Sequence, residues 1–358
     1  MYNECIQLTR QFTFCPNAFR IDLYKGCDFG CQYCFANMDW AQYKQEETWD
    51  IADFNKIKRI FYLALETDKQ GKDILVELIR HRVPIHCGGM SDPFQSREKD
   101  CGLTKQLIQL SNQYSYPVQF STKTARFPEG YINILNPKIH AFQVSIMGWD
   151  DEYIHKWEMN TPSAKERLDF VKYLRENDFW CGIRIQPIID GEQAIKLCNH
   201  IKNNADYVTI EHFKSVLDCM AIRQAIINKW EDKTQLTTRA HKLEVRKDIR
   251  LKNIKQIIEI MNAYDVCVGV GDNDLHYMTQ GRCCCGIDRI EGFENYLKYN
   301  LTYFVTGEHT GNEWVPKCNP RKHINDQKYG LDLDCKKYVD DYIREHPDYT
   351  GKKKRGLF

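Results

Sequence analysis

Between residues 19 and 272, seven short apolar runs alternate with longer amphipathic stretches. The runs are rich in branched and aromatic side chains, which is typical of buried strands. They read FRIDLYKG, VPIHCGG, PVQFSTK, IHAFQVSIMG, FWCGIRIQPI, ADYVTIEHF and YDVCVGVGD. The stretches between them have helical length and periodicity, and we expect helices over residues 53–66, 74–81, 102–114, 164–177, 192–203 and 251–264. Because strands that alternate with helices form βα units, the sequence predicts an α/β fold, a partial or full (β/α) barrel of parallel strands.

The character of the sequence changes after residue 272. The next residues are dense in cysteine, aromatics and turn-forming residues, and the chain ends with the basic segment GKKKRGLF. We therefore divide the chain into an N-terminal segment (residues 1–18), a barrel core (residues 19–272) and a cysteine-containing C-terminal extension (residues 273–358).

The amino-acid composition restricts the cellular compartment and the binding partners that we expect. A net charge of +1 gives the whole chain no attraction to nucleic acid or to membranes. No apolar run approaches the roughly 20 residues of a membrane span, and the first residues lack the layout of a signal peptide. We expect a cytoplasmic protein without a membrane partner. In that setting, the 16 cysteines indicate metal binding by a clustered subset rather than a disulfide framework.

One such subset lies in the segment YKGCDFGCQYCFAN, which contains Cys27, Cys31 and Cys34. The segment follows the first strand of the core and so lies at the mouth of the expected barrel, where active sites are built. A structural zinc site needs four protein ligands, usually in two close pairs, and no second pair follows here. A four-iron cluster that keeps one iron open needs only three cysteines. The spacing leaves both a zinc knuckle with a remote ligand and such a cluster possible.

The Cys-x3-Cys-x2-Cys spacing, with Tyr33 before the last cysteine, resembles the radical S-adenosylmethionine (radical SAM) superfamily. The similarity continues toward the spore photoproduct lyase-like branch, over about 170 residues. The segments that carry it are IHCGGMSDPFQSRE, FSTKT, VSI, WEMNTPSAKERL and IRIQPIIDG. The resemblance implies a radical SAM type barrel and an enzyme that reductively cleaves S-adenosylmethionine to a 5′-deoxyadenosyl radical, which abstracts hydrogen from a substrate. It also implies a one-electron reductant such as flavodoxin or ferredoxin as a partner.

The resemblance assigns Cys27, Cys31 and Cys34 to a [4Fe-4S] cluster whose open iron takes the methionine group of the cofactor. The cofactor-binding residues that it implies are Gly88, Gly89, Ser91, Asp92, Lys123, Ser145 and Arg184. Plainer interpretations exist for several of them: a strand-terminal turn for the glycine pair, a turn former for the aspartate that precedes Pro93, and a surface lysine at position 123. A buried arginine needs an anionic partner, for which the cofactor carboxylate or a nearby acid would serve. We also expect an ion pair between Glu158 and Arg167.

The substrate is not defined by these motifs. The branch resemblance slightly favours a nucleobase, nucleotide or nucleic acid. The basic run over residues 239–255 would line a phosphate-tracking face if it were one helix, although a solvated helix is the commoner meaning. Three alternatives stay open: a peptide-modifying radical SAM enzyme with an auxiliary cluster, a zinc-stabilised nucleic-acid-binding module without catalysis, and an iron–sulfur sensor.

A second cysteine group, Cys283, Cys284 and Cys285, lies in GRCCCGID. Neighbouring side chains in extended chain point to opposite faces, but a tight turn supported by Gly281 and Gly286 would aim two thiols the same way. The group is then a candidate for a second metal site, completed by Cys318 and Cys335, or for a hydrogen-atom donor to a substrate radical. A packed turn of small residues is the plainer interpretation.

Overall fold

An eight-stranded sheet forms the centre of the molecule in the computed structural model, which describes residues 1–3, 5–9, 17–36, 49–68, 73–216, 220–239, 242–272, 274–297 and 299. The strand order is β1-β2-β5-β6-β7-β8-β9-β13, and every neighbouring pair is parallel except β1 and β2. The strands are β1 (Ile6–Leu8), β2 (Phe19–Ile21), β5 (Ile85–Cys87), β6 (Val118–Thr122), β7 (His140–Ser145), β8 (Cys181–Ile188), β9 (Tyr207–His212) and β13 (Val268–Val270). Each of the seven predicted apolar runs contains one or two strands, as the sequence predicts.

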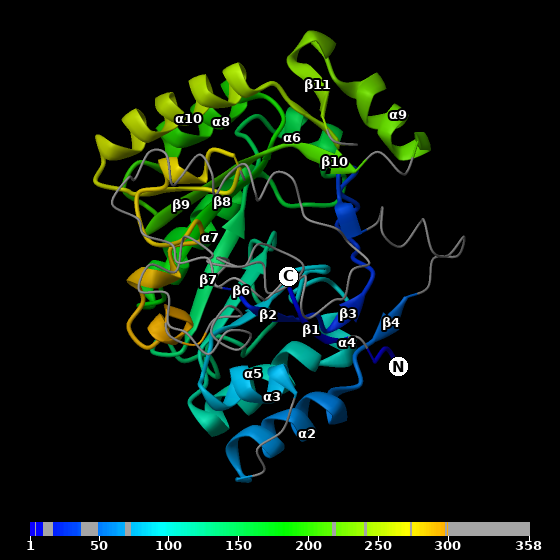
Figure 1. The fold of residues 1–358 in the computed structure, drawn as a ribbon, viewed down its shortest axis with the longest axis vertical. Helices are drawn as coiled ribbons and strands as arrows, with labels where there is room; N and C mark the ends of the chain where they lie inside the picture. Colours follow the sequence, from blue (N-terminus) through cyan, green and yellow to red (C-terminus); the bar gives the residue numbers. More distant parts are fainter. Residues whose placement is uncertain are drawn as a thin grey trace, which may run out of the picture.

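Helices cover one face of this sheet, with α2, α3 and α5 at one end, α8 and α10 at the other and α7 between them (Figure 1). They are α2 (Phe54–Leu65), α3 (Ile74–Arg80), α5 (Leu103–Tyr114), α7 (Ala164–Glu176), α8 (Gly191–Ile201) and α10 (Lys247–Asn262). Side-chain caps begin four of them: Asp53, Asp73, Asp190, and a capping box formed by Ser163 and Glu166. These caps satisfy amide groups that a helix start leaves open, and they explain why the helices begin close to the predicted positions.

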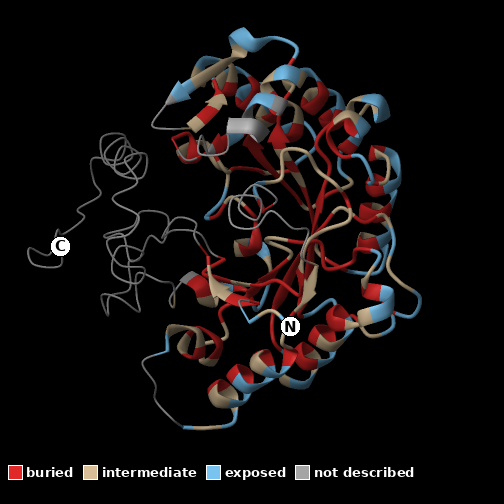
Figure 2. Cartoon of the chain, turned by 90° about the vertical axis from the view of Figure 1, so that its right-hand side faces the viewer, coloured by how far each residue is buried: buried red, intermediate tan, exposed pale blue. Residues whose placement is uncertain are grey.

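The sheet strands are almost wholly buried, and the helices bury the side that faces them (Figure 2). The helix-facing side of the sheet is apolar, with Phe120 and Phe142 stacked at a ring distance of 5.6 Å. The opposite face is polar. His86 on β5 lies close enough to Arg184 on β8 that, with burial as the main cause, the guanidinium helps lower the pKa of His86 to about 3. Because two strands separate β5 from β8, these side chains meet across a concave inner face, as in a partial barrel. The predicted α/β fold class is therefore confirmed, and of the two predicted forms the structure has the partial barrel.

Several elements were not predicted. These are α4 (Glu98–Cys101), α6 (Asp151–Trp157), α9 (Met220–Lys229), a two-stranded sheet of β3 (Tyr24–Lys25) and β4 (Asp50–Ile51), and a three-stranded sheet of β10 (Lys214–Val216), β12 (Lys242–Val245) and β11 (Leu236–Arg239). The basic run over residues 239–255 is thus not one helical face, because it includes the end of β11, all of β12 and the first half of α10. No helix in the described ranges is long and apolar enough to cross a membrane.

Candidate functional site

The predicted cofactor residues gather at the edge where the parallel strands end. Gly88 follows β5, Lys123 follows β6, and Ser145 is the last residue of β7. Arg184 on β8 pairs in register with Ser145, so the two residues lie side by side. The cysteine loop leaves the sheet after β2 and β3 at the same edge. The geometry therefore brings the predicted residues together at one mouth.

The three loop thiols are partly buried and close enough to affect one another. Burial, the Asp92 carboxylate and the Cys34 thiol raise the pKa of Cys27 to about 12. Burial also raises the pKa of Cys31, and the Lys123 ammonium opposes that rise. Such thiols ionise readily only when a metal takes them as ligands.

The donor set fits a cluster better than a single ion. In the part of the chain that the structure describes, no three His, Cys, Asp or Glu side chains converge on one point that could hold a metal ion. In a four-iron cluster each thiolate binds a different iron, so its ligands lie farther apart than those around one zinc. Cys27, Cys31 and Cys34 supply from one loop the three thiolates that a four-iron cluster with one open iron needs, and the described residues include no set of three such ligands placed around a single ion.

The cysteine loop is fastened to the segment that follows α6. Cys31 forms an isolated antiparallel bridge with Glu158, and the Gln32 amide donates to the carbonyl of Trp157 at 2.9 Å. The Asn160 amide in turn donates to the carbonyl of Phe29 at 3.2 Å. These main-chain bonds fix the loop against one edge of the mouth.

Glu158 is the centre of a buried ionic cluster at that edge. Its carboxylate accepts from Arg167 at 2.8 Å and from Tyr33, and it lies 3.7 Å from the Lys123 ammonium. Arg167 is fully buried and also donates to the carbonyl of Ser145 at 2.7 Å. The predicted ion pair of Glu158 with Arg167 is confirmed. Burial alone would raise the pKa of Glu158, but Arg167 and Lys123 hold it below the ordinary value.

The same cluster keeps Lys123 charged. Burial alone would lower the pKa of Lys123, yet Glu158 and Cys31 raise it above the ordinary value. The lysine is therefore not the surface residue of the plainer interpretation. It is a sheltered cation between the cysteine loop and the ends of β6 and β7.

Packing within the chain itself explains why glycine occupies positions 88 and 89. Gly88 has φ +104°, and a Cβ there would lie 2.3 Å from the carbonyl oxygen of Ser121. A Cβ on Gly89 would lie 2.8 Å from the Cδ of Arg20. The next amide, that of Met90, donates to the buried Asp22 carboxylate at 2.7 Å. Close packing at the end of β5 thus requires glycine with or without a ligand.

Ser91 and Asp92 are both buried at the mouth. The Asp92 carboxylate accepts from the Lys123 amide at 2.6 Å, from the Thr122 hydroxyl at 2.8 Å and from the Phe94 amide at 2.9 Å. Burial raises the pKa of Asp92 to about 6 despite these bonds. Asp92 therefore links the loop after β5 to the end of β6 through hydrogen bonds. These contacts agree with the plainer interpretation of Asp92 as a turn former.

Of the two anionic partners considered for Arg184, the cofactor carboxylate and a nearby acid, the structure does not provide the acid. The Arg184 guanidinium donates to Gln186, which donates to Glu211, and Glu211 pairs with Lys214. Within the described ranges, Arg184 makes no ion pair with a carboxylate. The reason is that a neutral amide separates it from the nearest acid, which leaves the guanidinium suited to an incoming anion.

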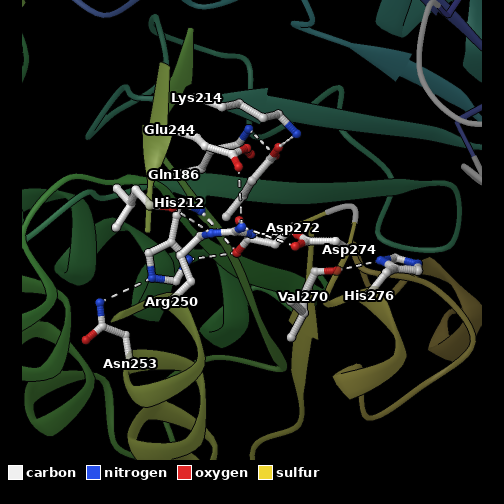
Figure 3. Close-up of polar contacts among 12 residues, drawn as sticks. Gln186, His212, Lys214, Glu244, Arg250, Asn253, Val270, Asp272, Asp274 and His276 are labelled. Carbon is white, nitrogen blue, oxygen red and sulfur yellow. Dashed lines mark hydrogen bonds and ion pairs between the residues drawn. The ribbon is translucent and has the colours of Figure 1, made fainter. Parts of the chain in front are cut away.

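A buried network that sequence reasoning missed lies beyond Glu211 (Figure 3). His212 Nδ1 lies 2.7 Å from Asp272, and Arg250 on α10 donates to Asp274 at 2.6 Å and to Asp272 at 3.4 Å. Its members come from β9, α10 and the loop after β13, so no local motif marks them. The only available signal was a set of acids directly after an apolar run.

The segment of Cys283, Cys284 and Cys285 packs on the inner side of the sheet. The Cys283 carbonyl accepts from Tyr207 at 3.0 Å and the Cys284 carbonyl from Thr209 at 2.7 Å. Further bonds to the segment come from Gln143, which donates to the Cys285 carbonyl at 3.4 Å, and from Asn17, whose amide nitrogen lies 3.9 Å from the Cys285 sulfur.

The turn brings two of the thiols together. The sulfurs of Cys283 and Cys285 are 3.7 Å apart, and Gly286 has φ +72° as a tight turn requires. The described residues include no set of three His, Cys, Asp or Glu side chains that could hold a metal ion, and Cys318 and Cys335 lie outside them. The predicted second metal site is therefore not shown. At this turn the Cys283 thiol donates to the Asp288 carboxylate at 2.9 Å.

Comparisons with known proteins agree with this geometry. Residues 21–195 match the profile of the radical SAM superfamily. These residues form a radical SAM domain. The domain identifies the chain as a radical SAM enzyme, and the zinc-stabilised module without catalysis does not agree with it. Among curated proteins, none matches the sequence significantly.

The fold of this radical SAM enzyme is similar to that of spore photoproduct lyase. A lyase double variant with bound AdoMet and dinucleoside spore photoproduct matches with 15% identity and a TM-score of 0.53, over 71% of this chain and 76% of the lyase. The lyase complexed with dinucleoside spore photoproduct matches with 14% identity and a TM-score of 0.54, over 72% and 76% of the two chains. At 14–15% sequence identity, this similarity shows a shared fold and no more.

Proposed function

We propose that this radical SAM enzyme holds a [4Fe-4S] cluster on Cys27, Cys31 and Cys34 and reductively cleaves S-adenosylmethionine to abstract hydrogen from a nucleobase or nucleotide. The observation that carries the proposal is the position of Lys123. Its sheltered ammonium lies 3.7 Å from the carboxylate of Glu158, and the main chain of Glu158 bridges to Cys31 in the cysteine loop.

The residues at the mouth match the groups of the cofactor. Lys123 and Arg184 are cations suited to the methionine carboxylate, and Ser145 offers a hydroxyl for the ribose on the strand between them. Glu158 and Arg167 hold the cysteine loop and the end of β7 in fixed relation. When bound, the cluster and the cofactor supply a primary carbon radical.

The inner face of the sheet supports a polar, planar substrate. Its side chains are amides, hydroxyls, imidazole and guanidinium. They include Gln119, whose fully buried amide has no hydrogen-bond partner among the described residues. A buried amide of this kind suits a ligand that presents both a donor and an acceptor. The spore photoproduct lyase structures hold a dinucleoside ligand, which favours the same substrate class.

The test is anaerobic turnover with cofactor, dithionite and deuterated dinucleotides, with deuterated peptides as the competing class. We expect dinucleotides to transfer deuterium into 5′-deoxyadenosine. Transfer from peptides alone would contradict the substrate class but keep the cleavage chemistry. No 5′-deoxyadenosine under any condition would contradict the proposed function as a whole.

The cysteine turn supports a second role. We propose that a thiol of Cys283, Cys284 or Cys285 gives a hydrogen atom to the substrate radical, because the segment is bonded to Gln143 and Thr209 on the inner face. Single alanine variants test it through the ratio of product to 5′-deoxyadenosine. One variant should lose this coupling, and equal coupling in all three would leave the turn a structural feature.

A further inference from the structure

A neutral side chain, that of Gln186, holds Arg184 at the mouth. The Nε of Arg184 donates to the Oε1 of Gln186, two residues along β8, and strand alternation places both side chains on the same face of the sheet. The pairing of β8 with β9 shifts register between Ile185 and Ile188, and such irregularities re-aim side chains beside functional sites. The Gln186 amide thereby contacts Arg184 on its own strand and Glu211 on β9.

The two partners of Gln186 fix the orientation of its amide. A guanidinium can only donate, so Arg184 requires the amide oxygen, and the Glu211 carboxylate accepts from the amide nitrogen. Glu211 pairs in turn with Lys214 at the start of β10. A carboxamide accepts and donates at once without carrying a charge. Arg184, Gln186, Glu211 and Lys214 thus form a row in which the neutral amide separates Arg184 from the acid.

This arrangement leaves part of the guanidinium unused. A guanidinium has five N–H donors, and Arg184 uses the one on Nε to reach Gln186. Across the part of the chain that the structure describes, its two terminal nitrogens make no hydrogen bond and no ion pair with a carboxylate. These nitrogens form the planar fork that matches a carboxylate in shape and charge. Gln186 therefore holds the guanidinium by one edge and leaves the charged fork available at the mouth.

We propose that Gln186 is a positioning residue for the cofactor, whose neutral amide presents the fork of Arg184 to the methionine carboxylate and keeps the charge of Glu211 one side chain away. The inference rests on the proposed function, in which Arg184 binds that carboxylate. An acid in direct contact with Arg184 would compete with the ligand, whereas Glu211 is already paired with Lys214. The order of the charges along the row, and not their sum, then sets the affinity for the cofactor.

The test exchanges the amide and the acid. Gln186→Glu/Glu211→Gln keeps the net charge, the side-chain sizes and the match of donors with acceptors along the row, but it places a carboxylate against Arg184. Calorimetry on the cluster-containing enzyme measures binding of S-adenosylmethionine and of decarboxylated S-adenosylmethionine, which lacks the group that Arg184 would bind. We expect the exchange to weaken binding of S-adenosylmethionine about tenfold and to leave the decarboxylated ligand unaffected. Glu211→Gln alone is the matched control and should bind both ligands as wild type does.

A second variant tests the same role if the exchange does not fold. Gln186→Leu removes both hydrogen bonds of the amide without adding a charge. It should weaken binding of S-adenosylmethionine severalfold, less than the exchange does, again without effect on the decarboxylated ligand. Iron content and urea unfolding identify folded protein that contains the cluster.

Wild-type affinity for S-adenosylmethionine in either variant of Gln186 would overturn the positioning role. Equal weakening for both ligands would overturn it as well, because the effect would then not depend on the carboxylate. Failure of the wild type to bind S-adenosylmethionine would instead contradict the proposed function itself.

Discussion

At the residue scale, the site is organised around one buried carboxylate. Glu158 is fully buried and is shared by Arg167, Tyr33 and Lys123, while its main chain bridges to Cys31. A buried charge is tolerated only when paired, and here the pairing links the cysteine loop to two strand ends. In the proposed function, Glu158 is thus a positioning residue, which holds the cysteine loop and Lys123 in place.

Lys123→Ala should weaken binding of S-adenosylmethionine by about tenfold to a hundredfold, because a charged hydrogen bond contributes roughly 1.5–3 kcal/mol. Iron content should not change, since the lysine is not a cluster ligand. Calorimetry on the cluster-containing enzyme measures the affinity and iron analysis the cluster content, with the exposed Lys138→Ala as control. Wild-type affinity in Lys123→Ala would remove the lysine from the site.

Glu158→Ala should lower the free energy of unfolding by about 3–5 kcal/mol, because it leaves the buried Arg167 charge unpaired. Asp169→Ala is the matched control, since it breaks an exposed pair with Lys165 and should have little effect. Urea unfolding of the metal-free chain measures the difference. Equal midpoints for the two variants would show that the buried cluster does not stabilise the fold.

At the element scale, strands and helices with continuous apolar patterns could be predicted, and those defined by distant pairing could not. β8 lies in a continuous apolar run, and this local pattern is enough to predict a strand. β11 and β12 are short and polar, and they become strands only because β12 pairs with β11 on one side and with β10 on the other. The same limit applies to the basic run over residues 239–255, which would form one phosphate-tracking face only on a single helix. Arg250 in this run is instead buried in ion pairs.

The network on α10 and the loop after β13 predicts a pH effect. Burial alone would raise the pKa of Asp272, but His212 and Arg250 lower it to about 2. The folded-state pKa then lies below that of the unfolded chain, near 3.9, so the ionised carboxylate contributes about 2 kcal/mol above that pH. This contribution is lost as the pH falls from about 5 toward 2.

Asp272→Asn should therefore lower the free energy of unfolding of the metal-free chain most at about pH 6. The difference in this free energy between the variant and wild type should become smaller as the pH falls. Urea unfolding at several pH values measures it. Asp248→Asn, in the exposed pair with Arg246 on the same helix, is the control and should show no such trend. A difference between wild type and Asp272→Asn that does not vary with pH would contradict this account.

At the scale of the whole molecule, the parallel sheet explains which site residues could be predicted. Strand ends in a parallel sheet meet at one edge, so the amino-acid sequence is enough to group Lys123, Ser145 and Arg184. Their contacts with distant segments could not be predicted, because Lys123 pairs with Glu158 and Arg184 is joined to Glu211 on β9 only through Gln186. The position of Cys285 beside Gln143 likewise depends on how the chain crosses the inner face of the sheet.

The most direct test asks whether the enzyme forms 5′-deoxyadenosine under anaerobic reduction. It also asks whether replacement of the three loop cysteines abolishes that activity. Reconstituted wild type should contain about four irons per chain and should produce 5′-deoxyadenosine from S-adenosylmethionine with dithionite, by mass spectrometry. The variant with Cys27, Cys31 and Cys34 all changed to Ala should remain folded, lose the iron and produce none. A triple variant that keeps its iron and still cleaves the cofactor would contradict the assignment.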